Sequence, residues 1–193
     1  MPQARRMLEQ MPPRRVTFAA VALVIAATTT PGALASPSVR LRADGIGAVH
    51  FGLAEARAVG ELRALFGAPS ARGFNTGCGP RYTEVVWGEL AAEFRSGRFS
   101  GYRYSSGGYP LTTPGSPQPR PTGRPGKPML VTPTGVSLGS TLRQLRAAYR
   151  LRLVGASRRQ APNGLVFVDD AKRDPEPPAS RIIEIKIGTC GDF

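Results

Sequence analysis

Residues 135–139 contain the pattern in this sequence that most suggests catalysis. They read Gly-Val-Ser-Leu-Gly, a literal G-x-S-x-G in which Ser137 would be the nucleophile of a small serine hydrolase. The chain's only histidine, His50, precedes this serine, whereas hydrolases with the motif have the order serine, acid, histidine. We therefore expect Ser137 to mark a turn and helix entry. His50, to which no fixed partner can be assigned, is expected to be an ordinary strand or turn residue.

Several acidic residues are close enough in the sequence to form a carboxylate pair, the arrangement that hydrolyses glycosidic bonds. They are Glu84, Glu89, Glu93, Asp169 and Asp170. Because acidic side chains are rarely buried, we expect solvated surface charges instead. One histidine and two cysteines cannot supply a Cys₂His₂ or Cys₄ zinc site. The prediction is a non-enzymatic protein without a metal or cofactor.

Three arginines suit a binding role. Arg143, Arg146 and Arg150 recur at spacings of three and four residues, so they share one face of an expected helix. Such a stripe could hold an acidic protein surface or an anionic polymer of the cell envelope. The alternative is a helix face that is merely solvated.

Aromatic side chains form a second candidate binding surface. Tyr102 and Tyr104 lie on the same face of an expected strand, because side chains alternate along a strand, and Arg103 lies near the rim. Together with Trp87 they could contact a partner protein. Packing of the same rings against helices is equally compatible with the sequence.

Apolar spacing predicts the elements that position these side chains. Leucine and aromatic residues at helical spacing predict helices around 61–66 and 142–149, and Gly60 is expected to divide the first helical region into two short pieces. Alternating apolar and polar residues then predict short strands. These cover 83–87, 90–94 and 99–104 in the first half, and 165–168 and 182–187 in the second, with 150–154 as a third candidate there. The last strand is expected to be half-buried, with its isoleucines at 183, 185 and 187 facing opposite to Glu184 and Lys186.

The chain repeats itself weakly on either side of a proline-rich segment. Residues 106–134 are predicted to be an exposed linker that no helix or central strand crosses. The step Val49-His50-Phe51-Gly52 before it and the step Val136-Ser137-Leu138-Gly139 after it both lead into helical segments. The offset is 87 residues at these glycines and 83 at the helices, so the first half has four extra residues, about one helical turn.

The predicted fold class is therefore α+β, with two similar repeats at 36–105 and 135–193, each a helix pair followed by an antiparallel meander. Neither repeat would bury much core alone, so we expect them to pack together. Each half holds one cysteine, Cys78 or Cys190. In an exported protein these two most simply form a disulfide; two free thiols or an intermolecular bridge are the alternatives.

A tandem of helix-helix-meander units, each opened by an apolar residue and a glycine, resembles the beta-lactamase-inhibitory-protein-like repeat. It is also similar to the outer-membrane assembly lipoproteins with a small helix-helix-three-strand fold. The resemblance covers 45–105 and 135–193, and it implies a secreted binding module that presents a sheet face to a partner protein. The inhibitory proteins carry a cysteine pair within each unit, whereas this chain has one cysteine per half, and no inhibitory contact residue is carried over.

Residues 1–35 have the order of a secretory signal peptide. Basic residues up to Arg15 precede an uninterrupted apolar run of 12 residues (16–27), and Ala33-Leu34-Ala35 supplies the small-x-small cleavage pattern before Ser36. The run is shorter than the roughly 20 residues that a spanning helix needs. We expect a secreted or extracytoplasmic, envelope-associated protein with no transmembrane span after cleavage. Export by the general or the twin-arginine route is compatible with the pair Arg14-Arg15.

The charge balance narrows the choice of partner. The 193-residue chain has a net charge of +13, and removal of four arginines and one glutamate with the signal leaves 22 basic and 12 acidic residues, or +10. Such a charge favours adhesion to anionic polymers or lipid surfaces, and no motif points to nucleic acid. The leading hypothesis is a module that binds an unknown exported or envelope protein through a sheet face. The alternative is electrostatic attachment to anionic cell-wall or lipid surfaces.

Overall fold

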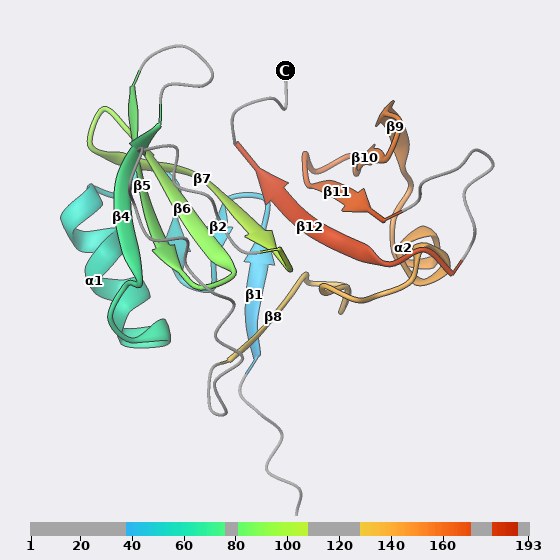
Figure 1. The fold of residues 1–193 in the computed structure, drawn as a ribbon, viewed down its shortest axis with the longest axis horizontal. Helices are drawn as coiled ribbons and strands as arrows, with labels where there is room; N and C mark the ends of the chain where they lie inside the picture. The colour runs from blue at the N-terminus through green and yellow to red at the C-terminus, as the bar shows by residue number, and fades with distance from the viewer. Residues whose placement is uncertain (1–37, 76–80, 108–127, 171–178, 189–193) are drawn as a thin grey trace, which may run out of the picture. The chain divides into compact units, whose positions relative to one another are not determined.

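The computed structural model describes residues 38–75, 81–107, 128–170 and 179–188 (Figure 1). Within these ranges the chain has a mixed α+β fold, which confirms the predicted class. The expected signal peptide and both cysteines, Cys78 and Cys190, lie outside the described residues. The disulfide and the cleavage site therefore stay predictions.

The described residues form two helices and twelve strands. The helices are α1 (Glu55–Phe66) and α2 (Leu142–Ala148). The strands are β1 (Ser38–Arg42), β2 (Gly45–Ile46), β3 (Val49–His50), β4 (Ala71–Asn75), β5 (Tyr82–Trp87), β6 (Leu90–Arg95), β7 (Arg98–Ser105), β8 (Met129–Val131), β9 (Arg152–Gly155), β10 (Arg158–Gln160), β11 (Val166–Asp169) and β12 (Ile182–Ile187).

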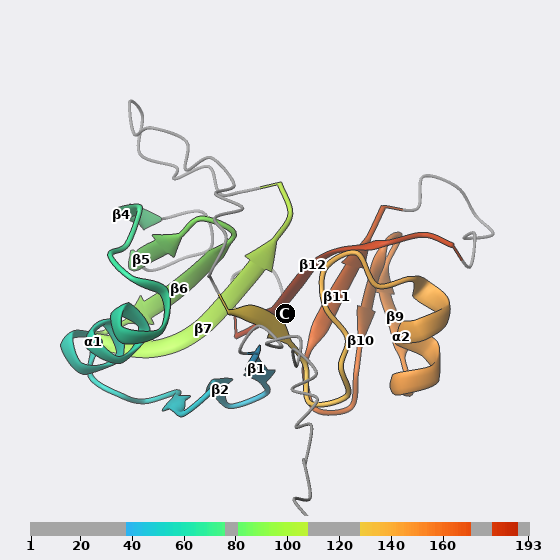
Figure 2. The same cartoon turned by 90° about the horizontal axis from the view of Figure 1, so that it is seen from below.

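Eight of these strands form one large antiparallel sheet in the order β4-β5-β6-β7-β12-β11-β10-β9. Strands β4 to β7 form a meander that follows α1, and β9 to β12 form a meander that follows α2. The two meanders meet where β7 pairs with β12, with Tyr104 opposite Ile185 and Tyr102 opposite Ile187. Figure 2 shows this junction, with α1 beside the first meander and α2 beside the second.

A smaller sheet has the order β3-β2-β1-β8, and its β1 and β8 run parallel. Strand β8 lies inside the segment 106–134 that was predicted to be an exposed linker. Leu130 and Val131 of β8 are buried, so the described end of this segment is an edge strand of the fold and not an exposed connection. An edge position tolerates the prolines on either side because an edge strand needs partners on one side only.

Each half contains one described helix, so the prediction of a helix pair is wrong for these residues. Helix α1 runs through Gly60 without a break. One glycine in a helix costs only about 1 kcal/mol, and burial of Leu62 and Phe66 against the sheet outweighs that cost. Helix α2 begins with a capping box in which Thr141 and Gln144 satisfy each other's backbone N–H groups.

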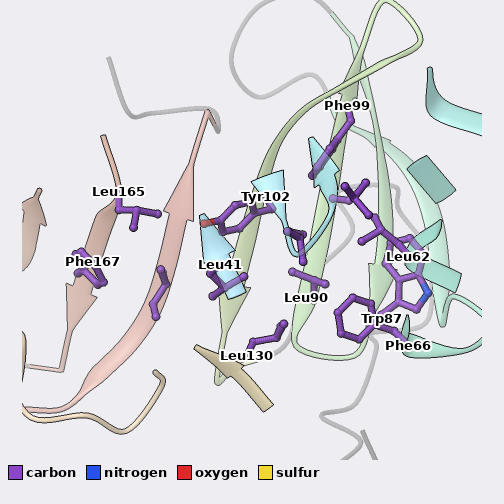
Figure 3. Close-up of a cluster of buried hydrophobic side chains, with 14 of the residues drawn as sticks. Leu41, Leu62, Phe66, Trp87, Leu90, Phe99, Tyr102, Leu130, Leu165 and Phe167 are labelled. Carbon is purple, nitrogen blue, oxygen red and sulfur yellow. The ribbon is translucent and has the colours of Figure 1, made fainter. Parts of the chain in front are cut away.

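A single apolar cluster extends through both halves (Figure 3). It joins Leu62 on α1 to Leu145 on α2 and includes Tyr102 and Ile185 from the two strands at the junction. Figure 3 shows Leu165 and Phe167 of the second half in the same cluster as Trp87 of the first. The two helices therefore cover one continuous core, and the first half has in addition a small separate cluster of Val86 and Ala91.

Strand β12 has the predicted bounds but a different pattern of burial. Ile182 and Ile185 are buried, whereas Ile183 is partly exposed. A register shift between β11 and β12 near Ile182 breaks the strict alternation. Lys186 is also buried, so both faces of this strand are covered at that position and the strand is not half-buried as predicted.

Candidate functional site

Hydrogen bonds to nearby residues hold both Ser137 and His50. The Ser137 hydroxyl donates to the Leu130 carbonyl at 2.8 Å, and the Ser137 N–H donates to Ser140 Oγ at 3.0 Å. The His50 Nδ1 lies 3.0 Å from a carboxylate oxygen of Asp44, a partner that the sequence pattern did not reveal. His50 is on β3 and Leu130 is on β8, which are opposite edges of the small sheet. These contacts fit turn and strand-end roles for the two side chains.

The aromatic residues predicted to form a binding surface lie mainly inside the protein. Trp87 is buried and its Nε1 donates to the Gly67 carbonyl at 3.0 Å. Tyr102 is fully buried, its hydroxyl donates to the Arg42 carbonyl at 2.9 Å, and burial raises its pKa. Only Tyr104 of the three is half-buried. The structure therefore corresponds to the alternative in which these rings pack in the core, and a partner cannot reach Trp87 or Tyr102.

Two of the predicted surface carboxylates are fully buried. Glu84 on β5 and Glu93 on β6 are cross-strand partners, and the expectation that they are solvated is wrong. Arg103 Nη2 lies 3.9 Å from Glu93 Oε1. The hydroxyl of Tyr82 is buried as well, and its pKa is raised to about 12 by burial and then by the negative charges of Glu93 and Glu84.

The same face of the sheet continues across the junction. Lys186 on β12 lies directly opposite Arg103 on β7, and Lys186 Nζ is 3.8 Å from Glu184 Oε1. We call Glu84, Glu93, Arg103, Glu184 and Lys186 the sheet-face charge cluster. Each cation lies near a carboxylate of its own half, which offsets the repulsion between the two neighbouring cations. Glu84, Glu93 and Lys186 of this cluster are buried and Arg103 and Glu184 are partly exposed, so the cluster forms a polar layer that reaches the surface.

The other predicted acidic residues differ in their surroundings. Asp169 is buried and accepts from Arg159 Nη1 at 2.8 Å, so the expectation of a solvated charge is wrong here too. Asp170 is exposed and accepts from the Arg181 N–H at 2.7 Å. Glu89 is half-buried. The structure thus brings Glu84 together with Glu93 but leaves the carboxylates of Asp169 and Asp170 with different partners.

An exposed group of arginines surrounds the last strand of the large sheet. Strand β9 is an edge strand and all four of its residues are exposed, including Leu153 at 64% and Val154 at 42%. We use the name basic edge for β9 together with the exposed arginines around it. These are Arg143, Arg146, Arg150, Arg152 and Arg158. The three predicted arginines are therefore exposed, but α2 ends at Ala148, so Arg150 lies beyond the helix and the prediction of one helix face is wrong for it. The sequence pattern also pointed to Arg158 and Arg159 beyond the stripe; Arg158 is exposed, Arg159 is buried, and Arg152 had no signal.

A pocket of about 420 Å³ lies within the basic edge. It is lined by Arg150, Leu151, Arg152, Gln160, Ala161 and Pro162. Arg152 Nη2 donates to Gln160 Oε1 at 2.7 Å, a contact that orients the guanidinium without neutralising it. The sequence has no acidic residue between Glu93 and Asp169, so no carboxylate from this stretch offsets the arginines. Two guanidinium groups beside an open pocket can bind a carboxylate or another oxyanion.

No group of three or more His, Cys, Asp or Glu side chains in the described ranges could hold a metal ion. In the same ranges, no helix is long and apolar enough to cross a membrane. No protein-family model, curated protein or solved structure matches this chain.

Proposed function

We propose that this chain is a non-enzymatic binding module and that the basic edge is its binding surface. The observation that carries the proposal is the coincidence of exposed arginines, exposed aliphatic side chains and an unpaired strand edge at β9. Arginine with adjacent apolar surface is the composition typical of protein interfaces. The predicted sheet-face surface is a poorer candidate because Trp87 and Tyr102 are buried.

We propose further that the module consists of two tandem repeats, each a single helix followed by a four-stranded meander. Matching backbone hydrogen bonds support this. The Gly52 N–H donates to the Phe99 carbonyl, and the Gly139 N–H donates to the Ile182 carbonyl, both at 2.8 Å. Phe99 and Ile182 are 83 residues apart, the offset expected after the helices, and the two glycines are 87 apart.

Side chains support the same equivalence. Arg98 Nη1 donates to the Gly52 carbonyl at 2.8 Å, and Arg181 Nη1 donates to the Gly139 carbonyl at 3.0 Å. Arg98 and Arg181 are again 83 residues apart. The opposed pair Arg103 and Lys186 at the junction has this offset too, as expected when equivalent strands of two repeats pair about a two-fold axis. The extra residues of the first half fall in α1, which has 12 residues against 7 in α2.

We propose that the protein is exported, with cleavage after Ala35. The support is the order of charge, apolar run and small residues in 1–35. Amino-terminal sequencing of the protein recovered from outside the cytoplasm should begin at Ser36. An intact amino terminus in that material would refute cleavage.

The binding function is tested with the full chain immobilised and exposed to envelope and culture-fluid components, then washed at low and high salt. A protein partner that survives high salt on the unchanged chain, and is lost when Arg150 and Arg152 are both changed to glutamine, supports the proposal. The matched control changes Arg57 and Arg72, which are exposed arginines of the first half, to glutamine. Equal retention by all three proteins would refute a role for the basic edge.

Electrostatic attachment to anionic cell-wall polymer or lipid is the second candidate function. The net charge of +10 that remains after the proposed cleavage and the exposed arginines favour it. Binding of this kind weakens steeply with salt because screening acts on exposed charges. In the same experiment it would release only polymer or lipid, and no protein, as the salt concentration rises.

A further inference from the structure

We infer that the basic edge binds an extended acidic segment of a partner protein as an additional strand beside β9, an inference that rests on the proposed binding function. Among the strands that the structure describes, β9 pairs only with β10, at the end of the large sheet. Backbone N–H and C=O groups of a strand point alternately to its two sides, so those on the outer side of β9 are available to another strand. Addition of a strand to such an edge is a common mode of peptide recognition.

The opposite edge of the same sheet shows why β9 is the better site. On β4, Arg72 hydrogen-bonds a carboxylate oxygen of Glu55, and the Phe74 ring lies 3.6 Å from the Arg81 guanidinium carbon. Both exposed side chains therefore have partners within the chain. On β9, Leu153 and Val154 are exposed, and Arg152 hydrogen-bonds the neutral amide of Gln160.

The charge of the surface selects the occupant. An antiparallel pair of β9 strands from two copies would place arginines of one chain near those of the other, and like charges across a strand pair are destabilising. A segment with Glu or Asp at alternate positions would instead place carboxylates against Arg150 and Arg152, where bidentate hydrogen bonds form. Its intervening apolar side chains would cover Leu153, and the pocket beside Arg150 is large enough to take one side chain.

The test uses a synthetic eight-residue peptide of alternating glutamate and valine, titrated into the full chain at physiological salt by calorimetry. The same peptide with lysine in place of glutamate controls for sequence-independent strand pairing. A third peptide keeps the glutamates but carries methyl groups on its backbone nitrogens, so it cannot donate main-chain hydrogen bonds.

The inference expects binding of the acidic peptide, no binding of the lysine peptide, and affinity at least tenfold lower for the methylated peptide. R152Q should weaken binding about threefold to fivefold, whereas R72Q on the opposite edge should leave it unchanged. Circular dichroism checks that both variants keep the fold, which is expected because both arginines are exposed.

Each contrary result overturns a defined part of the proposals. Failure of the acidic peptide to bind, or equal binding of the methylated peptide, overturns strand addition. If a captured protein still depends on Arg150 and Arg152, the binding function survives that failure. If capture is also independent of these arginines, the proposed function falls with the inference.

Discussion

The two halves of this chain share a hydrogen-bonding scheme but differ in how they treat charge. In the first half two exposed arginines meet carboxylates: Arg57 lies 2.9 Å from Glu61 on α1, and Arg72 meets Glu55. In the second half α2 contains no acidic residue, and both of its arginines, Arg143 and Arg146, are exposed. The difference lies in the two helices: α1 carries acidic and basic residues together, whereas α2 carries only basic ones.

In the core, by contrast, it is the second half that pairs an arginine with a carboxylate. In the first half, Val85, Ala92 and Tyr102 lie in a row across three neighbouring strands. The matching row of the second half is Arg159, Phe167 and Ile185, so Arg159 takes the place of Val85. The second half therefore has a buried ion pair, Arg159 with Asp169, where the proposed repeat has an apolar side chain in the first. Burial lowers the pKa of the Arg159 guanidinium, and the charge of Asp169 opposes that shift.

The largest expected effect comes from breaking that buried pair. Asp169→Ala should lower the free energy of unfolding by about 3–5 kcal/mol, because it removes the carboxylate that compensates a buried guanidinium. Urea denaturation followed by circular dichroism measures the change. Asp170→Ala is the control and should cost about 1 kcal/mol, since that carboxylate is exposed and accepts one backbone N–H. Replacing both Arg159 and Asp169 by valine should recover much of the loss; an equal loss in the double variant would contradict this account.

Core truncations in the two helices test whether the halves unfold together. Leu62→Ala on α1 and Leu145→Ala on α2 should each cost about 2–5 kcal/mol, because both leucines are fully buried in the one apolar cluster. The fluorescence of Trp87, the only tryptophan, reports the first half. It should show the lower urea midpoint for both variants. If Leu145→Ala left the urea midpoint of the Trp87 fluorescence unchanged, the halves would unfold independently.

Alkaline pH should destabilise the protein through two tyrosines of the first half. Burial, with nearby carboxylates, raises the pKa of both Tyr82 and Tyr104 from 10.0 to about 12. The unfolded chain therefore releases these protons at lower pH than the folded chain, so their stabilising contribution is complete below pH 10 and is lost as the pH rises towards 12. Urea midpoints by circular dichroism should fall from pH 9 to pH 11, and Tyr82→Phe should make that fall smaller. A midpoint that is the same at both pH values would contradict the prediction.

Two glycines at equivalent turns of the proposed repeats provide a test of that equivalence. Gly52 and Gly139 have φ of +86° and +80°, and a Cβ at either position would meet nothing within 4 Å. The cost of alanine is therefore backbone strain alone, about 1–2 kcal/mol, and it should be equal at the two sites. Thermal unfolding of the two variants measures it. Clearly unequal costs would argue against equivalent turns.

The smallest effect concerns the helix that the sequence predicted to be broken. Gly60→Ala should stabilise the protein by about 1 kcal/mol, because Gly60 lies inside α1 and a Cβ there meets nothing within 4 Å. Chemical denaturation should give a higher midpoint for this variant. Loss of stability would show that Gly60 is needed for a feature other than helix continuity.

The sequence pattern could reveal strands that are long enough to show alternating apolar and polar residues on their own. Predicted strands at 83–87, 90–94 and 99–104 match β5, β6 and β7 to within one residue at each end, and 182–187 is identical to β12. Strands β2 and β3 have two residues each and β8 and β10 have three. Segments so short carry no periodic signal, and they become strands only through pairing with distant residues.

For the candidate site, too, the sequence predicted only the part that a local pattern sets. The shared face of Arg143 and Arg146 on α2 was predictable because a spacing of three residues is set by the helix alone. The place of Arg150 beyond the helix end and the contribution of Arg152 were not, since they depend on β9 forming the edge of a sheet whose order is fixed by long-range pairing. The pocket beside Arg150 likewise requires β9 and β10 to lie together.

By itself, then, the sequence determined the α+β class, the main strands and the apolar side of each helix, because hydrophobic periodicity is a local property. Only the tertiary structure decided which charged residues are buried. Alternation assigns Glu84, Glu93 and Lys186 to the face opposite the core, but it carries no information on whether that face is covered. Burial of a polar face depends on contacts between residues far apart in the chain, which a local sequence pattern does not record.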